Sequence, residues 1–198
     1  MDNLTFFDSI AEKWDEIAIH NKNKVDFIVK SACIESNNRV LDLGSGTGVL
    51  IPFIKTYIGI HGKIVALDIS SKMLELAKKK NGTDQVDYIC TDFLKYQCDY
   101  KFQVIMAYSC FPHFLDDKAF FRKCDELLVE KGRLVIAHSE SKEMINASHK
   151  NLNGEVISGI LKDTIEVIKI ANEAGFEEKI KIQNDEIYLI ILERKKGY

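Results

Sequence analysis

The sequence predicts an α/β protein built on a doubly wound sheet of five parallel strands, with helices on both faces and an antiparallel hairpin at the C-terminal end. Short apolar, β-branched runs recur along the chain, and most are almost continuously apolar, as expected for strands buried on both faces of a parallel sheet. Longer segments with helical periodicity separate these runs. Such alternation of strand and helix implies parallel strands covered on both sides.

Five apolar runs are the expected parallel strands. They lie at residues 39–43, 63–67, 86–90, 102–107 and 133–137. Two later runs, at residues 179–183 and 186–193, are joined through Asn184 and Asp185. These two residue types favour a tight turn, so the two runs should form the antiparallel hairpin.

Six segments carry the helical pattern. In chain order they are residues 6–17, 25–34, 49–57, 71–80, 117–130 and 163–174. Ser70 or Ser71 is the expected N-cap of the fourth segment, and Gly132 stands where the C-terminus of the fifth favours glycine. We expect Phe6, Phe7 and Trp14 in the first segment to be core or helix-packing residues.

Length and composition point to one domain spanning residues 1–198. The chain is 46% hydrophobic and has only two prolines, which leaves little room for linkers. Residues 1–36 are expected to form N-terminal helices covering the site. Residues 139–162 exceed what the scaffold needs, and we interpret them as an inserted lid or substrate segment.

Charge and cysteine content exclude several classes of protein. The formal net charge is −3 and no basic run exceeds three residues, which disfavours binding of a nucleic acid backbone as the main role. Five cysteines without a C-x-x-C pair predict reduced thiols. The first residues lack the features of a signal peptide, and no run of 18 apolar residues occurs, so we expect a cytoplasmic protein without a membrane span.

A glycine-rich turn follows the first strand. Gly44, Gly46 and Gly48 are spaced G-x-G-x-G, which lets backbone N–H groups and a helix N-terminus approach a ligand. An NAD-dependent oxidoreductase remains an alternative, although its G-x-G-x-x-G pattern needs glycine where Val49 stands. Asp42 lies within the apolar strand, where a carboxylate is costly unless something binds it. Accepting backbone N–H groups of the turn is its alternative role.

The stretch from Val40 to Leu50 resembles motif I of the class I S-adenosylmethionine-dependent methyltransferases, and the likeness extends over nearly the whole chain. It implies a Rossmann-like enzyme of the small-molecule type that moves the methyl group of S-adenosyl-L-methionine to a small acceptor by in-line attack. It also implies a set of cofactor-binding residues: Asp42, Gly44, Ser45, Gly46 and Gly48 in the first motif, Asp68 and Ile69 at the ribose and adenine, Asp92 and Phe93 at the adenine, and Tyr108 and Ser109 facing the methionine part.

Topology alone brings the same positions together. The glycine turn, Asp68, Asp92, Tyr108 and His138 each come just after a predicted strand. Ligands of open parallel sheets bind outside the carboxyl ends of the strands, where the strand order reverses. A nucleoside-type cofactor is therefore expected at this edge, and a cofactor-binding module without catalysis is a further alternative.

Three of the five histidines, His113, His138 and His149, lie in segments expected to face the cleft. A hydroxyl, thiol or ammonium acceptor must lose a proton, and histidine is the natural base at neutral pH, so these three are the catalytic candidates. Two alternatives stay open. In the first, these histidines are ordinary residues of a solvated helix and loop that cover the site. In the second, His138 and His149 form a metal site with Glu140. The spacing of these three residues matches no standard metal site, and we predict no metal. The residues leave the acceptor, and the atom that is methylated, open.

Overall fold

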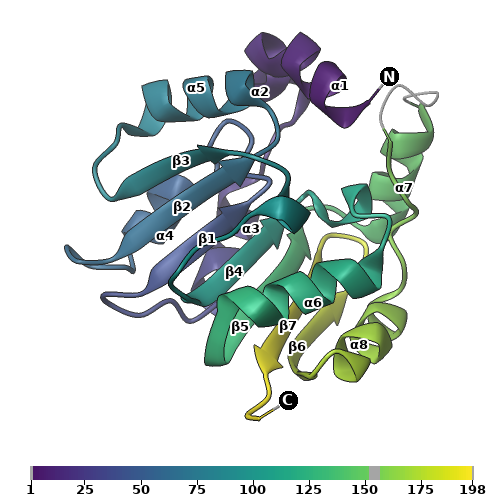
Figure 1. Cartoon of the computed structure of the whole chain (residues 1–198). Coiled ribbons are helices and arrows are strands. Elements are labelled where there is room, and N and C mark those ends of the chain that lie inside the picture. The colour runs from purple at the N-terminus through teal and green to yellow at the C-terminus, as the bar shows by residue number, and fades with distance from the viewer. Residues whose placement is uncertain (1, 152–156, 198) are drawn as a thin grey trace.

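The sheet of the computed structural model, which describes residues 2–151 and 157–197, has seven strands in the order β3-β2-β1-β4-β5-β7-β6 (Figure 1). β1 to β5 are parallel, and β7 runs antiparallel to both β5 and β6. The strands are β1 (Arg39–Leu43), β2 (Lys63–Asp68), β3 (Val86–Cys90), β4 (Phe102–Tyr108), β5 (Leu128–His138), β6 (Phe176–Gln183) and β7 (Tyr188–Arg194). The predicted fold class is confirmed.

Helices connect these strands and cover both faces of the sheet (Figure 1). They are α1 (Asn3–Ile10), α2 (Trp14–Ile17), α3 (Lys22–Ser31), α4 (Ile51–Lys55), α5 (Ser71–Asn81), α6 (Asp117–Leu127), α7 (Lys142–Asn151) and α8 (Thr164–Glu173), with 3-10 turns η1 (Ala11–Lys13), η2 (Phe93–Lys95) and η3 (Phe111–His113). Ser70 is the N-cap of α5, because its hydroxyl accepts the N–H of Met73.

The core follows the two-residue period of the strands. On β1, Val40 belongs to an apolar cluster with side chains of α3, α4 and α5, whereas Leu41 and Leu43 belong to a cluster with α6 and α8. Both faces of the central strands are thus buried, which explains why their sequences are almost continuously apolar.

The start of β5 differs from the prediction. The helix expected at residues 117–130 ends at Leu127, and β5 begins at the next residue. Gly132 therefore lies inside a strand, where the register with β4 shifts. A Cβ on Gly132 would lie 2.9 Å from the carbonyl oxygen of Val129, so this irregular turn of the strand requires glycine.

Two other predicted elements differ in detail. The expected N-terminal helix at residues 6–17 is divided into α1, η1 and α2. The hairpin loop spans residues 184–187, because the side chain of Asn184 accepts the N–H groups of Glu186 and Ile187 and so holds a wider turn than the two-residue turn predicted. The inserted segment 139–162 contains α7, and its residues 152–156 lie outside the described residues.

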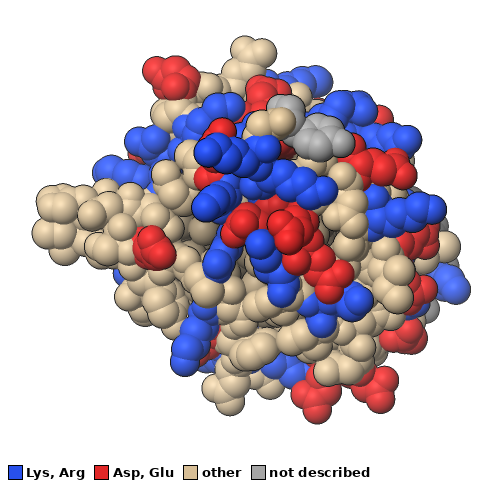
Figure 2. Space-filling model, turned by 90° about the horizontal axis from the view of Figure 1, so that it is seen from below, with Lys and Arg blue, Asp and Glu red and all other residues tan. Residues whose placement is uncertain are grey.

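Charge is mixed over the face seen in Figure 2, where Lys and Arg side chains surround a group of Asp and Glu. Opposite charges form ion pairs, as between Lys179 and Glu193 at 3.1 Å. In the ranges 2–151 and 157–197, none of the helices combines the length and apolar character that crossing a bilayer requires.

Candidate active site

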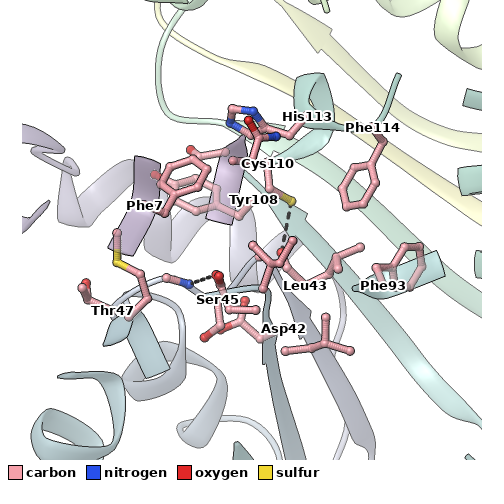
Figure 3. Close-up of a pocket in the computed structure, with 18 of the residues that line it drawn as sticks. Phe7, Asp42, Leu43, Ser45, Thr47, Phe93, Tyr108, Cys110, His113 and Phe114 are labelled. Carbon is pink, nitrogen blue, oxygen red and sulfur yellow. Dashed lines mark hydrogen bonds between the residues drawn. The ribbon is translucent and has the colours of Figure 1, made fainter. Parts of the chain in front are cut away.

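A cavity of about 320 Å³ opens at the carboxyl ends of β1, β2, β3 and β4. Its volume lies in the range of small-molecule sites. Residues that follow each of these four strands line it, and residues of α1 and α2 complete its wall. Figure 3 shows Phe7, Tyr108 and His113 on one side of the cavity and Phe93 and Phe114 on the other.

The glycine turn after β1 forms the floor of this cavity. Gly44 and Gly46 have φ values of +65° and +54°, which favour glycine. A Cβ on Gly44 would lie 2.6 Å from the Cβ of Cys110, whereas a Cβ on Gly46 would meet nothing closer than Trp14 Nε1, at 3.7 Å. The first glycine is therefore needed for packing, and the second keeps the space above the turn open.

Gly48 does not line the cavity, although it is one of the predicted cofactor-binding residues. Its φ is +82°, and a Cβ there would lie 2.6 Å from Asn81 Nδ2 and 3.1 Å from the Cβ of Ala77. Both neighbours belong to α5. The third glycine thus allows the turn to pack closely against this helix.

Two buried carboxylates, Asp42 and Asp68, line the cavity. Burial raises the pKa of Asp42 to about 7, although the Ser45 hydroxyl donates to its Oδ2 at 2.8 Å. Asp68 accepts the N–H of Gly46 on Oδ2 at 2.8 Å and that of Ser70 on Oδ1 at 2.9 Å; burial nevertheless raises its pKa. Asp68 therefore accepts the backbone N–H groups that hold the turn. The sequence had offered this as the alternative role of Asp42, and that alternative is wrong.

Asp68 has hydrogen-bonding capacity left for a ligand. Each carboxylate oxygen can accept about two hydrogen bonds, and one is used on each here. Ile69, next to it, lines the cavity, as do Asp92 and Phe93 after β3. The side chain of Asp92 accepts the N–H of Leu94, which fixes the chain beside the cavity. The carboxylate of Asp68, with lone pairs left for two hydroxyl groups, therefore lies beside an apolar surface formed by Ile69 and Phe93.

The N-terminal helices contribute residues that the sequence did not single out for binding. Asn3, Phe7 and Trp14 line the cavity. Phe7 and Trp14 pack on each other, with ring centroids 5.6 Å apart, as expected of helix-packing residues, but they also face the cavity, while Phe6 is buried. Spacings of four and seven residues would place the three on one face of the single helix expected from the sequence, but aromatic residues on a helix face more often indicate a core. Side-chain bonds attach this segment: Asp8 Oδ1 accepts from Ser70 Oγ at 2.5 Å, and Asp15 binds Thr47 and Lys80 at 2.6 Å.

A second polar group was also missed. His20, in the loop after α2, lines the cavity, and its Nδ1 lies 2.8 Å from the hydroxyl of Tyr108. That hydroxyl is also 2.8 Å from Ser139 Oγ, and Ser109 lines the cavity with φ +56°. A lone histidine in an N-terminal loop carries no sequence signal, because its partner is 88 residues away.

The three candidate histidines are not equivalent. His113 lines the cavity, and its ring packs perpendicular to the ring of Phe7, with the ring centroids 5.3 Å apart. Burial lowers the pKa of His113 to about 4. It is therefore neutral at pH 7 and has one ring nitrogen with a free lone pair, although burial makes it a weaker base than a free imidazole.

His138 and His149 do not line the cavity. His138 is 1% exposed, and neither of its ring nitrogens has a hydrogen-bond partner among the described residues; burial lowers its pKa to about 3. His149 lies behind His113, with ring centroids 5.4 Å apart. The structure thus places only one of the three where it could meet a ligand of this cavity. Among the described residues, no group of three His, Cys, Asp or Glu side chains has the arrangement of a metal site.

The cavity fits a nucleoside-type cofactor. Gly46 leaves room over exposed backbone, Asp68 offers free acceptor positions, and apolar side chains flank them. All of the predicted cofactor-binding residues except Gly48 line this cavity.

Comparisons with known proteins agree with these features. A family model described as a methyltransferase domain matches residues 40–132. The chain is 34% identical over 167 residues to demethylmenaquinone methyltransferase of Thermotoga maritima, covering 80% of this chain and 69% of that protein. It is 27% identical over 134 residues to malonyl-[acyl-carrier protein] O-methyltransferase of Priestia megaterium, covering 66% of this chain and 48% of that protein.

Solved structures share the fold. The complex of the Haloferax volcanii Trm112 methyltransferase activator with its methyltransferase contains a chain that matches with a TM-score of 0.83 at 16% identity, covering 98% of each chain. Magnesium protoporphyrin IX methyltransferase from Synechocystis PCC 6803, solved with bound SAH, matches with a TM-score of 0.71 at 17% identity, covering 97% of each chain.

Proposed function

This chain belongs to the class I S-adenosylmethionine-dependent methyltransferase family, and from that membership we propose that it methylates a small, largely apolar acceptor, with His113 as the base. The observation that carries the proposal is that the glycine turn, Asp68, Asp92 and His113, from four different strand ends, line one cavity. The same cavity thus offers cofactor-binding groups and a neutral imidazole.

Residues at three strand ends would hold the cofactor. Asp68 would accept the ribose hydroxyls on its free lone pairs, Asp92 and Phe93 would contact the adenine beside Ile69, and the turn at Gly44 to Gly46 would supply backbone N–H groups. When bound, S-adenosylmethionine supplies an electrophilic methyl carbon on a sulfonium sulfur that leaves as a neutral thioether. The protein's own task is therefore mainly alignment in a water-poor site.

The wall opposite the adenine end supports an apolar, ring-bearing acceptor. Phe7 and Trp14 line it together with His113, and aromatic faces stack well on planar rings. Leu115 also lines the cavity and is 66% exposed, so it adds an apolar side chain at the solvent-accessible part of the lining. The N–H of Gly159 donates to the carbonyl of Pro112 at 2.7 Å, which holds residue 159 against η3.

Cofactor binding is tested first, without an acceptor. We expect the wild-type chain to bind S-adenosylhomocysteine and not NAD in calorimetry. Asp68→Asn should weaken S-adenosylhomocysteine binding by about tenfold or more, since a hydrogen bond to a charged group contributes about 1.5–3 kcal/mol. Asp87→Asn, at an exposed position on the neighbouring strand, is the matched control. Binding of NAD alone, or an unaltered affinity in Asp68→Asn, would contradict the assignment.

Methyl transfer is tested next with labelled S-adenosylmethionine. A short-chain demethylmenaquinol, chosen after the Thermotoga maritima relative, and a malonyl thioester, chosen after the Priestia megaterium relative, are the two acceptor probes. We expect transfer to the quinol, and a loss of about 10²–10⁴-fold in His113→Gln with little change in cofactor affinity. His61→Gln, at an exposed histidine, is the control. Full transfer by His113→Gln would exclude His113 as the base.

A further inference from the structure

The backbone N–H and the backbone carbonyl of Ile157 are both bound by one side chain of α1. Asn3 Nδ2 donates to the Ile157 carbonyl oxygen at 2.9 Å, and the Ile157 N–H donates to Asn3 Oδ1 at 2.7 Å. The two residues are 154 positions apart, so this pair joins the N-terminal helix to the segment that follows α7. A two-point contact of this kind fixes both the position and the orientation of the carbonyl group.

The same carbonyl oxygen is a partner of His113. His113 Nδ1 lies 3.2 Å from it, and a carbonyl oxygen has two lone pairs, so it can accept from Asn3 and from His113 together. Because a carbonyl can only accept, the neutral imidazole must carry its proton on Nδ1. Its lone pair is then on Nε2.

Helix α1 constrains the His113 ring a second time. The ring of Phe7, one turn along from Asn3, is perpendicular to the imidazole at 89°. Phe7 and Asn3 both line the cavity with His113. The tautomer and the rotation of the ring therefore both depend on how α1 is seated.

We propose that Asn3 is a positioning residue, which holds the Ile157 carbonyl so that His113 keeps the Nδ1–H tautomer and directs its Nε2 lone pair to the methyl acceptor. The statement that Nε2 is directed to the methyl acceptor rests on the proposed function. In that step the bond between the acceptor atom X, for example a hydroxyl oxygen, and its hydrogen breaks, and the proton goes to Nε2. The electron pair remains on X and forms the new bond to the methyl carbon, whose bond to the sulfonium sulfur breaks. The resulting imidazolium keeps its Nδ1–H bond to the carbonyl, whose dipole stabilises the positive charge.

Two other polar groups near His113 affect its pKa and therefore its charge at neutral pH. His149 is the titratable neighbour that lowers the pKa of His113, after the larger effect of burial, and the Ile157 carbonyl opposes both. Loss of the Asn3 contact should therefore change the tautomer and the ring position, and not the net charge of His113 at neutral pH.

The tautomer is measured by two-bond ¹H–¹⁵N correlation spectra of the histidine side chains in the full chain, with S-adenosylhomocysteine added. The His113 signals are assigned by their loss in His113→Gln. We expect the Nδ1–H pattern at pH 7 in the wild type. In Asn3→Ala we expect mixed tautomers, and methyl transfer to the quinol probe reduced about 5- to 50-fold, with S-adenosylhomocysteine affinity changed less than threefold.

Two variants separate positioning from simple attachment of the helix. Leu4→Ala removes an exposed neighbour on α1 and should leave spectrum and transfer unchanged. Asn3→Asp keeps the acceptor for the Ile157 N–H but loses the donor to its carbonyl, and should behave as Asn3→Ala. An Nε2–H tautomer in the wild type, or a wild-type spectrum in Asn3→Ala, would overturn the positioning role. Full transfer by His113→Gln together with the expected spectra would instead overturn the base assignment alone.

Discussion

At the floor of the cavity, Asp42 and Asp68 show how two neighbouring carboxylates acquire different roles. Asp42 is 2% exposed and receives one side-chain hydrogen bond, whereas Asp68 is 8% exposed and receives two backbone hydrogen bonds. Burial therefore opposes ionisation of Asp42 with little compensation. Asp68 is held in place by the turn and faces the ligand space.

Asp42 predicts a pH dependence of stability. Its pKa is raised to about 7 from 3.8, so between these values the unfolded chain loses this proton while the folded chain keeps it. The contribution of Asp42 to the free energy of unfolding should fall as pH rises through this window and level off above it, whereas the lowered pKa values of His113 and His138 make the contributions of these two residues rise. Asp42→Asn should remove the falling contribution and make the protein more stable at pH 8 by roughly 1–4 kcal/mol, since one pKa unit corresponds to about 1.4 kcal/mol.

Urea unfolding of the ligand-free protein at pH 5 and pH 8 measures this effect. Asp87→Asn on β3, where the carboxylate is exposed, is the control and should follow the wild type. An Asp42→Asn variant whose stability changes between the two pH values by the same amount as that of the wild type would show that Asp42 is ionised throughout.

At the scale of elements, the glycine turn has two separate functions. Gly46 keeps space open toward Trp14, and Gly48 lets the turn pack on α5. Both have positive φ, so alanine is strained at either position. Only at Gly48 would the new Cβ also meet neighbours at 2.6 Å and 3.1 Å.

Paired substitutions separate these functions. Gly46→Ala should cost about 1–2 kcal/mol of stability from φ alone and weaken S-adenosylhomocysteine binding, because its methyl group enters the cavity. Gly48→Ala should cost about 1–3 kcal/mol more, because overpacking against α5 is added. Chemical unfolding and calorimetry on both variants measure the two effects. Equal stability of the two variants would rule out the packing role of Gly48.

The strands and the cavity floor were predictable because local sequence determines them. Buried parallel strands read as apolar runs, and the residues that follow them meet at one sheet edge whatever the helices do. The boundary at Leu128 was not predictable, since α6 and β5 adjoin without a loop and both are apolar. His20 and Asn3 were not found, because each acts through a partner more than 80 residues away.

Among the histidines, sequence position was a poor guide to placement. His138 is the last residue of β5, yet its side chain is buried and does not line the cavity, with its ring 5.9 Å from that of Tyr188. A residue at a strand end can point to either side of the sheet, and one residue of register decides which. His113 reaches the cavity because η3 turns the chain back over it.

At the scale of the whole molecule, the distribution of charge bears on the class of acceptor. The net charge is −3, which gives the chain as a whole no attraction for a polyanion. Lysines near the site are engaged too: Lys80 binds Asp15, and Lys142 binds Asp163, both at 2.6 Å. A polyanion that approached would have to displace these carboxylates, which opposes binding electrostatically.

Salt dependence distinguishes a small apolar acceptor from a nucleic acid. Binding that neutralises six to ten phosphates weakens by about 10³–10⁵-fold between about 50 and 200 mM salt, because counterions are released. A short-chain quinol bound by aromatic and apolar side chains releases none, so its KM should change less than about twofold over the same range. In parallel, fluorescence anisotropy with short labelled RNA and DNA duplexes should show no saturable binding at the low-salt end. A steep fall of transfer with salt, or saturable duplex binding that a tenfold excess of unlabelled duplex removes, would instead indicate a polyanionic acceptor and a basic surface formed where this cavity opens.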